Sequence, residues 1–148
     1  MSPDATDERG RWLGVAVSAL SLLVGSALPL PPRHNPDFGP YGPDKLLHLL
    51  GHAGLAAALV AALDDGGPSV RGAVAAVVAS TVYGVGTELL QEQIPGREFE
   101  RGDVAAGLVG SLLGVGLWRR VASTNSTARS RQRRHGSPGG ERARDPDG

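Results

Sequence analysis

The sequence predicts an all-α membrane protein, a polytopic chain whose four transmembrane helices form a compact bundle. Three observations lead to this prediction. Four segments are nearly free of charge, although charged residues make up 20% of the 148-residue chain. The charges gather at the chain ends, where residues 1–11 and 119–148 hold 16 of the 30 charged side chains. The four segments also lack a polar face, which is typical of helices that are buried or face lipid.

The alternative to a membrane bundle is a soluble four-helix bundle. Helices of a soluble bundle have an apolar stripe and an opposite polar face. The segments without a polar face are residues 13–28, 53–63, 73–82 and 104–118. In a chain this small, four helices that are apolar on every side can be buried only by lipid, so we expect a bilayer around them.

The first uncharged segment covers residues 12–32 and predicts a span at about 12–30. It is long enough, because a hydrocarbon core about 30 Å thick needs roughly 20 helical residues. A cleaved signal peptide is the alternative, since Gly25-Ser26-Ala27 is a small-x-small site. Against it, the polar N-terminal tail, residues 1–11, holds three acidic residues beside two arginines.

Turn residues separate the other three spans. Six prolines between residues 29 and 43 exclude a helix there and predict an extended loop. Asp-Asp-Gly-Gly-Pro at 64–68 and Ile-Pro-Gly at 94–96 end the next two apolar segments. The resulting spans are expected at about 45–63, 70–91 and 103–118. They are short for a bilayer, which tilting of helices and snorkelling of side chains at their ends allow.

Basic residues predict the orientation in the cell membrane. With four spans both termini lie on one side, and that side carries 11 of the 15 Lys and Arg residues against 4 on the other. Because cytoplasmic segments carry the excess of Lys and Arg, both termini are predicted to be cytoplasmic. Many of these arginines lie in the C-terminal tail, residues 119–148, which is expected to be disordered from its Ser, Thr, Arg, Gly and Pro content.

The composition excludes several classes of chemistry. Without cysteine the chain has no disulfide, thiolate nucleophile or cysteine-based metal site. Its net charge is zero, and it contains no phosphate-binding glycine loop, nucleophile elbow or nucleic-acid module. We therefore expect no cofactor and no nucleic-acid partner. The expected partner is the lipid bilayer, with an envelope lipid or glycan as candidate ligand.

Ionisable residues inside membrane segments are costly, so each is a functional candidate. Asp44, His48 and His52 are spaced by four residues and lie on one side of a helix. Glu88 and Gln91 share a side at the end of the third span. All of them fall toward the outer ends of the predicted helices. The candidate polar site comprises Asp44, Lys45, His48, Glu88, Gln91, Arg97 and Asp103.

Asp103 begins a stripe of small residues on the fourth span. Gly107, Gly110 and Gly114 follow it at spacings of four, three and four, which places all four residues on one side of the helix. Gly110 and Gly114 form a small-xxx-small pair, which permits close contact between helices. We expect the three glycines to pack against another span, with the Asp103 carboxylate above them.

Three kinds of site fit this cluster, and a purely structural role is a further alternative. Lys45 and Arg97 can hold an anionic headgroup or carboxylate. His48 and His52 with a carboxylate have metal-ligand spacing, although the chain has no His-Glu-x-x-His motif. His48 with one carboxylate suits general acid–base catalysis. Alternatively, the acids pair with the basic residues only to lock the helices together. We carry forward a binding site without a metal, and whether it catalyses a reaction stays open.

Two motifs resemble those of the VanZ-like family of small multi-pass membrane proteins. Asp44-Lys45-Leu46-Leu47-His48 resembles the family signature at the start of a span. The second signature is matched, in order and spacing, by Glu88, Gln91, Pro95, Gly96, Arg97, Phe99 and Asp103. The resemblance covers about residues 44–118, half of the chain.

The resemblance implies a multi-pass membrane protein of the cell envelope, since the namesake of the family is associated with low-level resistance to the glycopeptide teicoplanin. Two positions depart from the family pattern. Gly107 stands where the family usually has Asn, and His52 stands where it often has an aromatic residue. We expect a protein that binds or protects an envelope component or lipid headgroup. A membrane-embedded enzyme acting on a lipid or lipid-linked substrate, and a structural or assembly subunit, are the alternatives.

Overall fold

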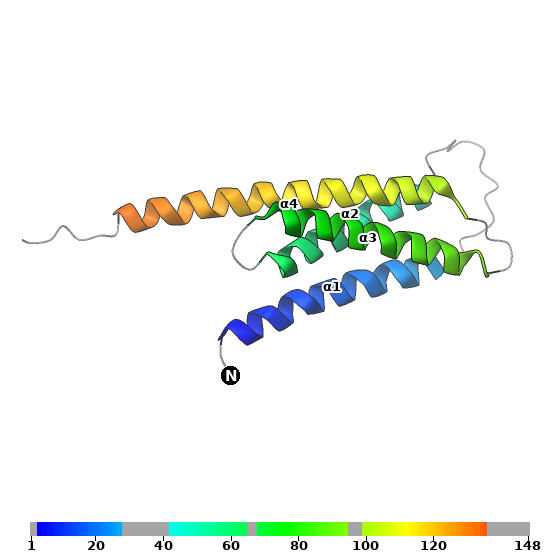
Figure 1. The fold of residues 1–148 in the computed structure, drawn as a ribbon, viewed down its shortest axis with the longest axis horizontal. Helices are drawn as coiled ribbons and strands as arrows, with labels where there is room; N and C mark the ends of the chain where they lie inside the picture. The colour runs from blue at the N-terminus through cyan, green and yellow to red at the C-terminus, as the bar shows by residue number, and fades with distance from the viewer. Residues whose placement is uncertain (1–2, 28–41, 65–67, 95–98, 136–148) are drawn as a thin grey trace, which may run out of the picture.

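The computed structural model describes residues 3–27, 42–64, 68–94 and 99–135, and this part of the chain forms four α-helices (Figure 1). The helices are α1 (Pro3–Ala27), α2 (Pro43–Leu63), α3 (Val70–Gln91) and α4 (Arg101–His135). The predicted all-α architecture with four apolar helices packed together is therefore confirmed.

Short polar motifs set the ends of α2 and α3. Asp44 lies in the first turn of α2, where a carboxylate interacts favourably with the helix dipole. The hydroxyl of Ser69 caps α3 by accepting a hydrogen bond from the Gly72 N–H at 2.9 Å. The Asp64 carboxylate in turn accepts hydrogen bonds from the Ser69 N–H and hydroxyl. The end of α2 is thus tied to the start of α3.

α2, α3 and α4 pack against one another, and α1 packs against α2 and α3 (Figure 1). The Tyr83 hydroxyl of α3 donates a hydrogen bond to the Ala19 carbonyl of α1 at 2.6 Å. Leu22 of α1 is buried against Gly51 of α2, where a β-carbon would collide with the leucine side chain. α2 is therefore the central helix, since it packs against all three others.

The distribution of side chains is that of a membrane protein. Among the described residues, 11 polar or charged residues are buried, against 8 hydrophobic ones. The outward surface carries large apolar side chains, among them Leu46, Leu50, Val74, Val82, Leu112 and Leu117. So large an exposed apolar surface favours contact with lipid. Four helical segments are long and apolar enough to cross a bilayer: Thr6–Ala27, Asp44–Leu63, Val70–Gln91 and Arg101–Asn125.

Both ends of the described chain are more helical than the sequence predicts. α1 begins at Pro3, inside the expected polar tail, and α4 continues to His135, well into the segment expected to be disordered. The physical reason at α4 is that Leu117 to His135 contains no glycine or proline, and Arg, Ala and Gln favour helix. Pro43, the last residue of the proline loop expected at 29–43, is instead the first residue of α2, where proline is compatible with a helix. Residues 29–41 of that loop and residues 136–148 lie outside the described residues.

An apolar core fills the end of the bundle where α2 finishes and α3 begins. It consists of Ala56 and Val60 of α2, Ala73 and Ala76 of α3, and Val115 of α4. Leu59, Val77 and Trp118 pack against it. The buried ionisable residues within α2, α3 and α4 gather at the opposite end of these helices: Asp44, His48, His52, Glu88 and Asp103.

Candidate polar site at one end of the bundle

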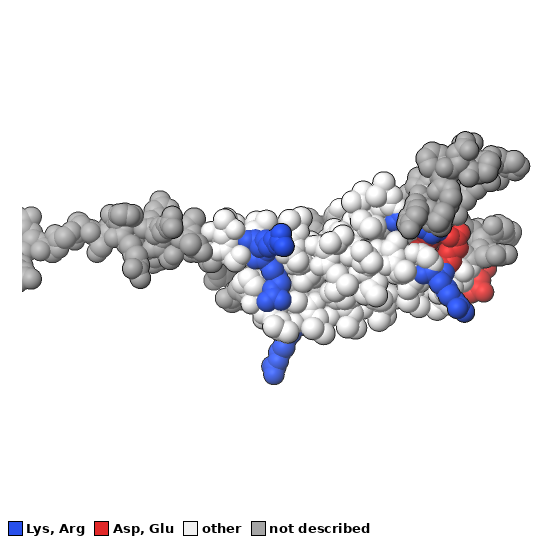
Figure 2. Space-filling view, turned by 90° about the horizontal axis from the view of Figure 1, so that it is seen from above, with Lys and Arg blue, Asp and Glu red and all other residues white. Residues whose placement is uncertain are grey.

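Charged side chains lie at the two ends of the molecule and leave an uncharged middle (Figure 2). In this view one end shows only Lys and Arg, whereas the other shows acidic and basic side chains together (Figure 2). The mixed end is formed by the start of α2, the end of α3 and the start of α4. The four helices are long and apolar enough to cross a bilayer, which is compatible with a place for the mixed end at one membrane face.

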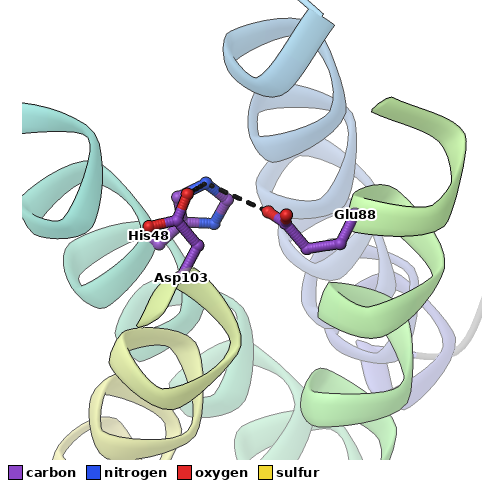
Figure 3. Close-up of side chains that lie close together, drawn as sticks. All are labelled: His48, Glu88 and Asp103. Carbon is purple, nitrogen blue, oxygen red and sulfur yellow. Dashed lines mark ion pairs between the residues drawn. The ribbon is translucent and has the colours of Figure 1, made fainter. Parts of the chain in front are cut away.

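Three helices each contribute one buried ionisable side chain to the centre of the mixed end (Figure 3). His48 comes from α2, Glu88 from α3 and Asp103 from α4. The Nε2 atom of His48 lies 3.6 Å from Glu88 Oε1 and 3.6 Å from Asp103 Oδ2. The three side chains are 7%, 2% and 8% exposed, respectively. An imidazole is thus held between two carboxylates, away from solvent.

Lys45 lies beside this group and is surrounded by acids. Its Nζ atom donates hydrogen bonds to Glu100 Oε2 at 2.8 Å and to Asp103 Oδ1 at 3.2 Å. Asp44 Oδ2 is 3.8 Å from the same ammonium group. Asp103 therefore faces Lys45 with one oxygen and His48 with the other.

Glu88 is almost completely buried and is fixed through one of its two oxygens. Oε2 accepts a hydrogen bond from the backbone N–H of Glu100 at 3.3 Å. Oε1 makes no hydrogen bond to the described residues, although it points toward His48. A buried carboxylate oxygen without a hydrogen bond is costly. It is therefore the atom of the cluster most in need of a further partner.

His52, one turn deeper than His48, belongs to a chain of neutral polar groups. Its Nδ1 shares a hydrogen bond with Ser80 Oγ at 3.0 Å. The hydroxyl of Ser111 lies 2.9 Å from Ser80 Oγ and 2.8 Å from the Gly107 carbonyl oxygen. The rings of His48 and His52 are stacked, with centroids 6.2 Å apart. This chain carries polar contacts from the cluster into the middle of the bundle.

Two glycines make the space in which the His52 ring lies. A β-carbon on Gly84 of α3 would approach the ring Cε1 to 2.8 Å, and one on Gly107 of α4 would approach Cδ2 to 2.8 Å. Both distances are shorter than real contacts of such carbons. The two departures from the VanZ-like pattern, His52 and Gly107, are therefore in contact with each other. The imidazole takes the space that a larger residue at 107 needs.

The other glycines of the α4 stripe lie directly against α2. A β-carbon on Gly110 would collide with the carbonyl group of Leu49, and one on Gly114 with that of Ala53. Asp103 and the three glycines are all buried. Since backbone carbonyls cannot rotate out of the way as side chains can, these positions fix how closely α2 and α4 approach.

The structure brings together five of the seven predicted site residues: Asp44, Lys45, His48, Glu88 and Asp103. Gln91 is buried at the last turn of α3. Arg97 lies outside the described residues. The nearest partner of Lys45 is Glu100, which the sequence analysis did not include. Ser80 and Ser111 were also missed, although hydroxyls inside apolar spans are a signal for interhelical contacts.

The described cluster is acidic overall. Four carboxylates, those of Asp44, Glu88, Glu100 and Asp103, gather around one lysine and one histidine. In a low-dielectric setting such an excess of negative charge favours a cation or a hydrogen-bond donor. His48, Glu88 and Asp103 line a small pocket together with His52, Thr81 and Leu108, among others. The pocket brings imidazole and carboxylate groups to one point between three helices.

Comparisons with protein-family models, with curated proteins and with solved structures find no match to this chain. The class of the protein therefore follows from the helices themselves. Four apolar helices packed together with polar groups inside are compatible with an integral, multi-pass membrane protein in a lipid bilayer.

Proposed function

We propose that the chain is a VanZ-like integral membrane protein of the cell membrane that binds or protects an envelope component or lipid headgroup through its polar cluster. One observation carries the proposal: α2, α3 and α4 each bury an ionisable side chain at a single point at one end of the bundle. Burying such groups costs several kcal/mol per ion. At the other end of these helices the space between all three is filled by apolar side chains instead.

A structural lock explains this cluster less well than a binding site does. Replacing a buried ion pair by apolar residues is often neutral or stabilising, so a bundle that needs only to hold together gains little from one. The second candidate function is a membrane-embedded enzyme acting on a lipid or lipid-linked substrate. It is favoured by the imidazole of His48 between two carboxylates, an arrangement suited to moving a proton.

The test separates function from folding in a deletion strain of the host that carries single variants. Glu88→Gln keeps the size and shape of the side chain, and Glu92→Gln, an exposed acid one turn along, is the matched control. We expect Glu88→Gln to accumulate in the membrane but to lose survival under envelope stress, and Glu92→Gln to keep both. If survival instead follows membrane abundance in every variant, the cluster is a structural lock.

Orientation is tested by single cysteines, because the chain has none of its own. We propose that both termini are cytoplasmic, which the 11-to-4 distribution of basic residues supports. An impermeant thiol reagent applied to intact cells should then label Pro36→Cys and Gln93→Cys, but not Ser2→Cys or Gly67→Cys. The reverse labelling pattern would place the polar cluster at the inner face.

A further inference from the structure

We infer that His48, Glu88 and Asp103 form a binding site for one divalent transition-metal ion, with Zn²⁺ as the best fit. The inference deepens the proposed function and rests on it for the role of the cluster. The three residues place one imidazole nitrogen and two carboxylate oxygens within 4.8 Å of one another. All three are buried and come from different helices, so the ion would join α2, α3 and α4 at one point.

The neighbouring acids show what a filled site looks like in this structure. Asp44, Glu100 and Asp103 also bring three carboxylate oxygens together, and the ammonium group of Lys45 lies among them at 2.8 to 3.8 Å. The second group shares Asp103 but has an imidazole in place of the third acid. Among the described residues no ammonium or guanidinium group is recorded within ion-pair distance of Glu88. One of two adjacent acidic groups is thus neutralised by a lysine, and the other is built to take a cation.

The distances fit a metal better than they fit hydrogen bonds. His48 Nε2 is 3.6 Å from both carboxylate oxygens, which is longer than a good hydrogen bond. Ligand atoms about 2.0–2.2 Å from a tetrahedral Zn²⁺ lie about 3.3–3.6 Å from one another. The two His48 separations are therefore at the upper limit of that range, and the two carboxylate oxygens lie within 4.8 Å of each other, so an inward movement of the carboxylates would complete the coordination.

Glu88 Oε1 is the independent sign that a ligand belongs here. The side chain is 2% exposed, and this oxygen makes no hydrogen bond to the described residues while it faces His48. The other oxygen is held by the Glu100 N–H, which orients the carboxylate toward the centre. An ion at that centre would satisfy Oε1, and two carboxylates would balance its charge of +2.

The ligand set selects the class of ion. An imidazole nitrogen suits Zn²⁺ and other transition metals, whereas Ca²⁺ and Mg²⁺ prefer oxygen ligands alone. Three protein ligands leave a fourth position open at a tetrahedral ion. Through that position the ion can bind an anionic oxygen of an envelope component, which an acidic cluster would otherwise repel. With the ion bound, a cluster that has more carboxylates than basic groups could still bind an anionic ligand.

The test is direct metal binding by the full chain in detergent, purified without a polyhistidine tag and stripped with a chelator. Zn²⁺ alone is titrated, and Co²⁺ serves as a spectroscopic probe of tetrahedral coordination. We expect one ion per chain, a rise in melting temperature on binding, and at least a tenfold weaker Kd in Glu88→Gln. Glu92→Gln, the exposed control on the same helix end, should bind as the unchanged chain does.

A second variant keeps the test decisive. Where Glu88→Gln does not fold, His48→Gln is used instead, and the Co²⁺ spectrum of the unchanged chain must show tetrahedral nitrogen and oxygen coordination. Absence of saturable one-to-one binding, or equal binding by Glu88→Gln, overturns the metal site. Metal binding without any envelope phenotype would refute the proposed function alone, and a phenotype without metal binding would refute the metal site alone.

Discussion

The two ends of the α2–α4 bundle solve the same packing problem with opposite chemistry. At one end Ala56, Val60, Ala73, Ala76 and Val115 close the space between the helices with methyl groups. At the other end His48, Glu88 and Asp103 meet at the corresponding place between the same helices. In lipid, packing of small apolar residues is sufficient to hold helices together. The polar end therefore contains more than assembly demands, and that surplus points to a function.

The glycine stripe of α4 packs against α2 between the two ends of the bundle. Changing it should therefore lower the stability of the bundle more than any other change. Gly110→Leu and Gly114→Leu should each destabilise the bundle by at least about 3 kcal/mol, because the added side chain meets backbone carbonyls of α2. The measurement is thermal melting in detergent together with membrane abundance. Gly116→Leu is the control, since nothing lies within 4 Å of a β-carbon there. An unchanged melting temperature for both Gly110→Leu and Gly114→Leu would mean that the glycine stripe does not support the contact between α2 and α4.

Removing the lysine should break the polar end alone. Lys45→Gln leaves Asp44, Glu100 and Asp103 without their shared cation. The expected loss is about 2–3 kcal/mol of unfolding free energy, below that of a fully buried pair because the side chain is 21% exposed. Arg101→Gln, an exposed cation at the start of α4, is the control and should melt normally. Equal melting temperatures of the two variants would show that hydration, rather than the charge of Lys45, stabilises these carboxylates.

The chain of neutral polar groups formed by His52, Ser80 and Ser111 tests how far the polar end extends into the bundle. Ser80→Ala removes the partner of His52 Nδ1 and one neighbour of Ser111. A buried nitrogen left without a hydrogen bond should cost about 1–3 kcal/mol, measured by melting in detergent. Ser123→Ala, a change at an exposed hydroxyl of α4, should cost nothing measurable. If both changes are silent, the polar end stops at His48 and the deeper chain adds no stability.

A change in the apolar core should have the smallest effect and leave function intact. Val60→Ala removes two methyl groups from the core, where Val60 is fully buried. Because lipid is itself apolar, only packing is lost, and we expect about 1 kcal/mol. Survival under envelope stress should stay at the level of the unchanged chain. A loss of survival as large as that of Glu88→Gln would mean that any loosening of the bundle impairs function, and the contrast between the ends would disappear.

Local sequence patterns predict the helices well, but they do not predict which residues of different helices come into contact. Uncharged runs and turn residues locate the four spans because a bilayer imposes both length and composition. The spacing of Asp44 and His48 shows that they share a face. No pattern on one helix, however, specifies which residue of another helix it meets. The meeting of His48 with Glu88 and Asp103 depends on the rotation and depth of three helices at once.

Two misses have distinct physical causes. Glu100 is not predictable as a site residue because it precedes α4 in a connecting segment, where an acidic residue is ordinarily solvated. Its position beside Lys45 depends on the tertiary fold. Helix α4 continues into the polar C-terminal segment because local helix propensity outweighs composition there: residues 117–135 contain no glycine or proline. The sequence shows Gly107 and His52 as two separate departures from the family pattern. The structure shows that they are linked, because the His52 ring occupies the space that a side chain at position 107 would need.

The length of α4 has a mechanical consequence. Its 35 residues extend about 52 Å, well beyond a hydrocarbon core of about 30 Å. A bilayer that held Asp103 near one face would therefore leave the last turns of α4, up to His135, beyond the other face. Because the glycines of α4 lie directly against α2, a tilt of the protruding part would act on this packing and, through it, on the contact of Asp103 with His48. In a bilayer, α4 would thus connect the polar end of the bundle with the opposite side of the membrane.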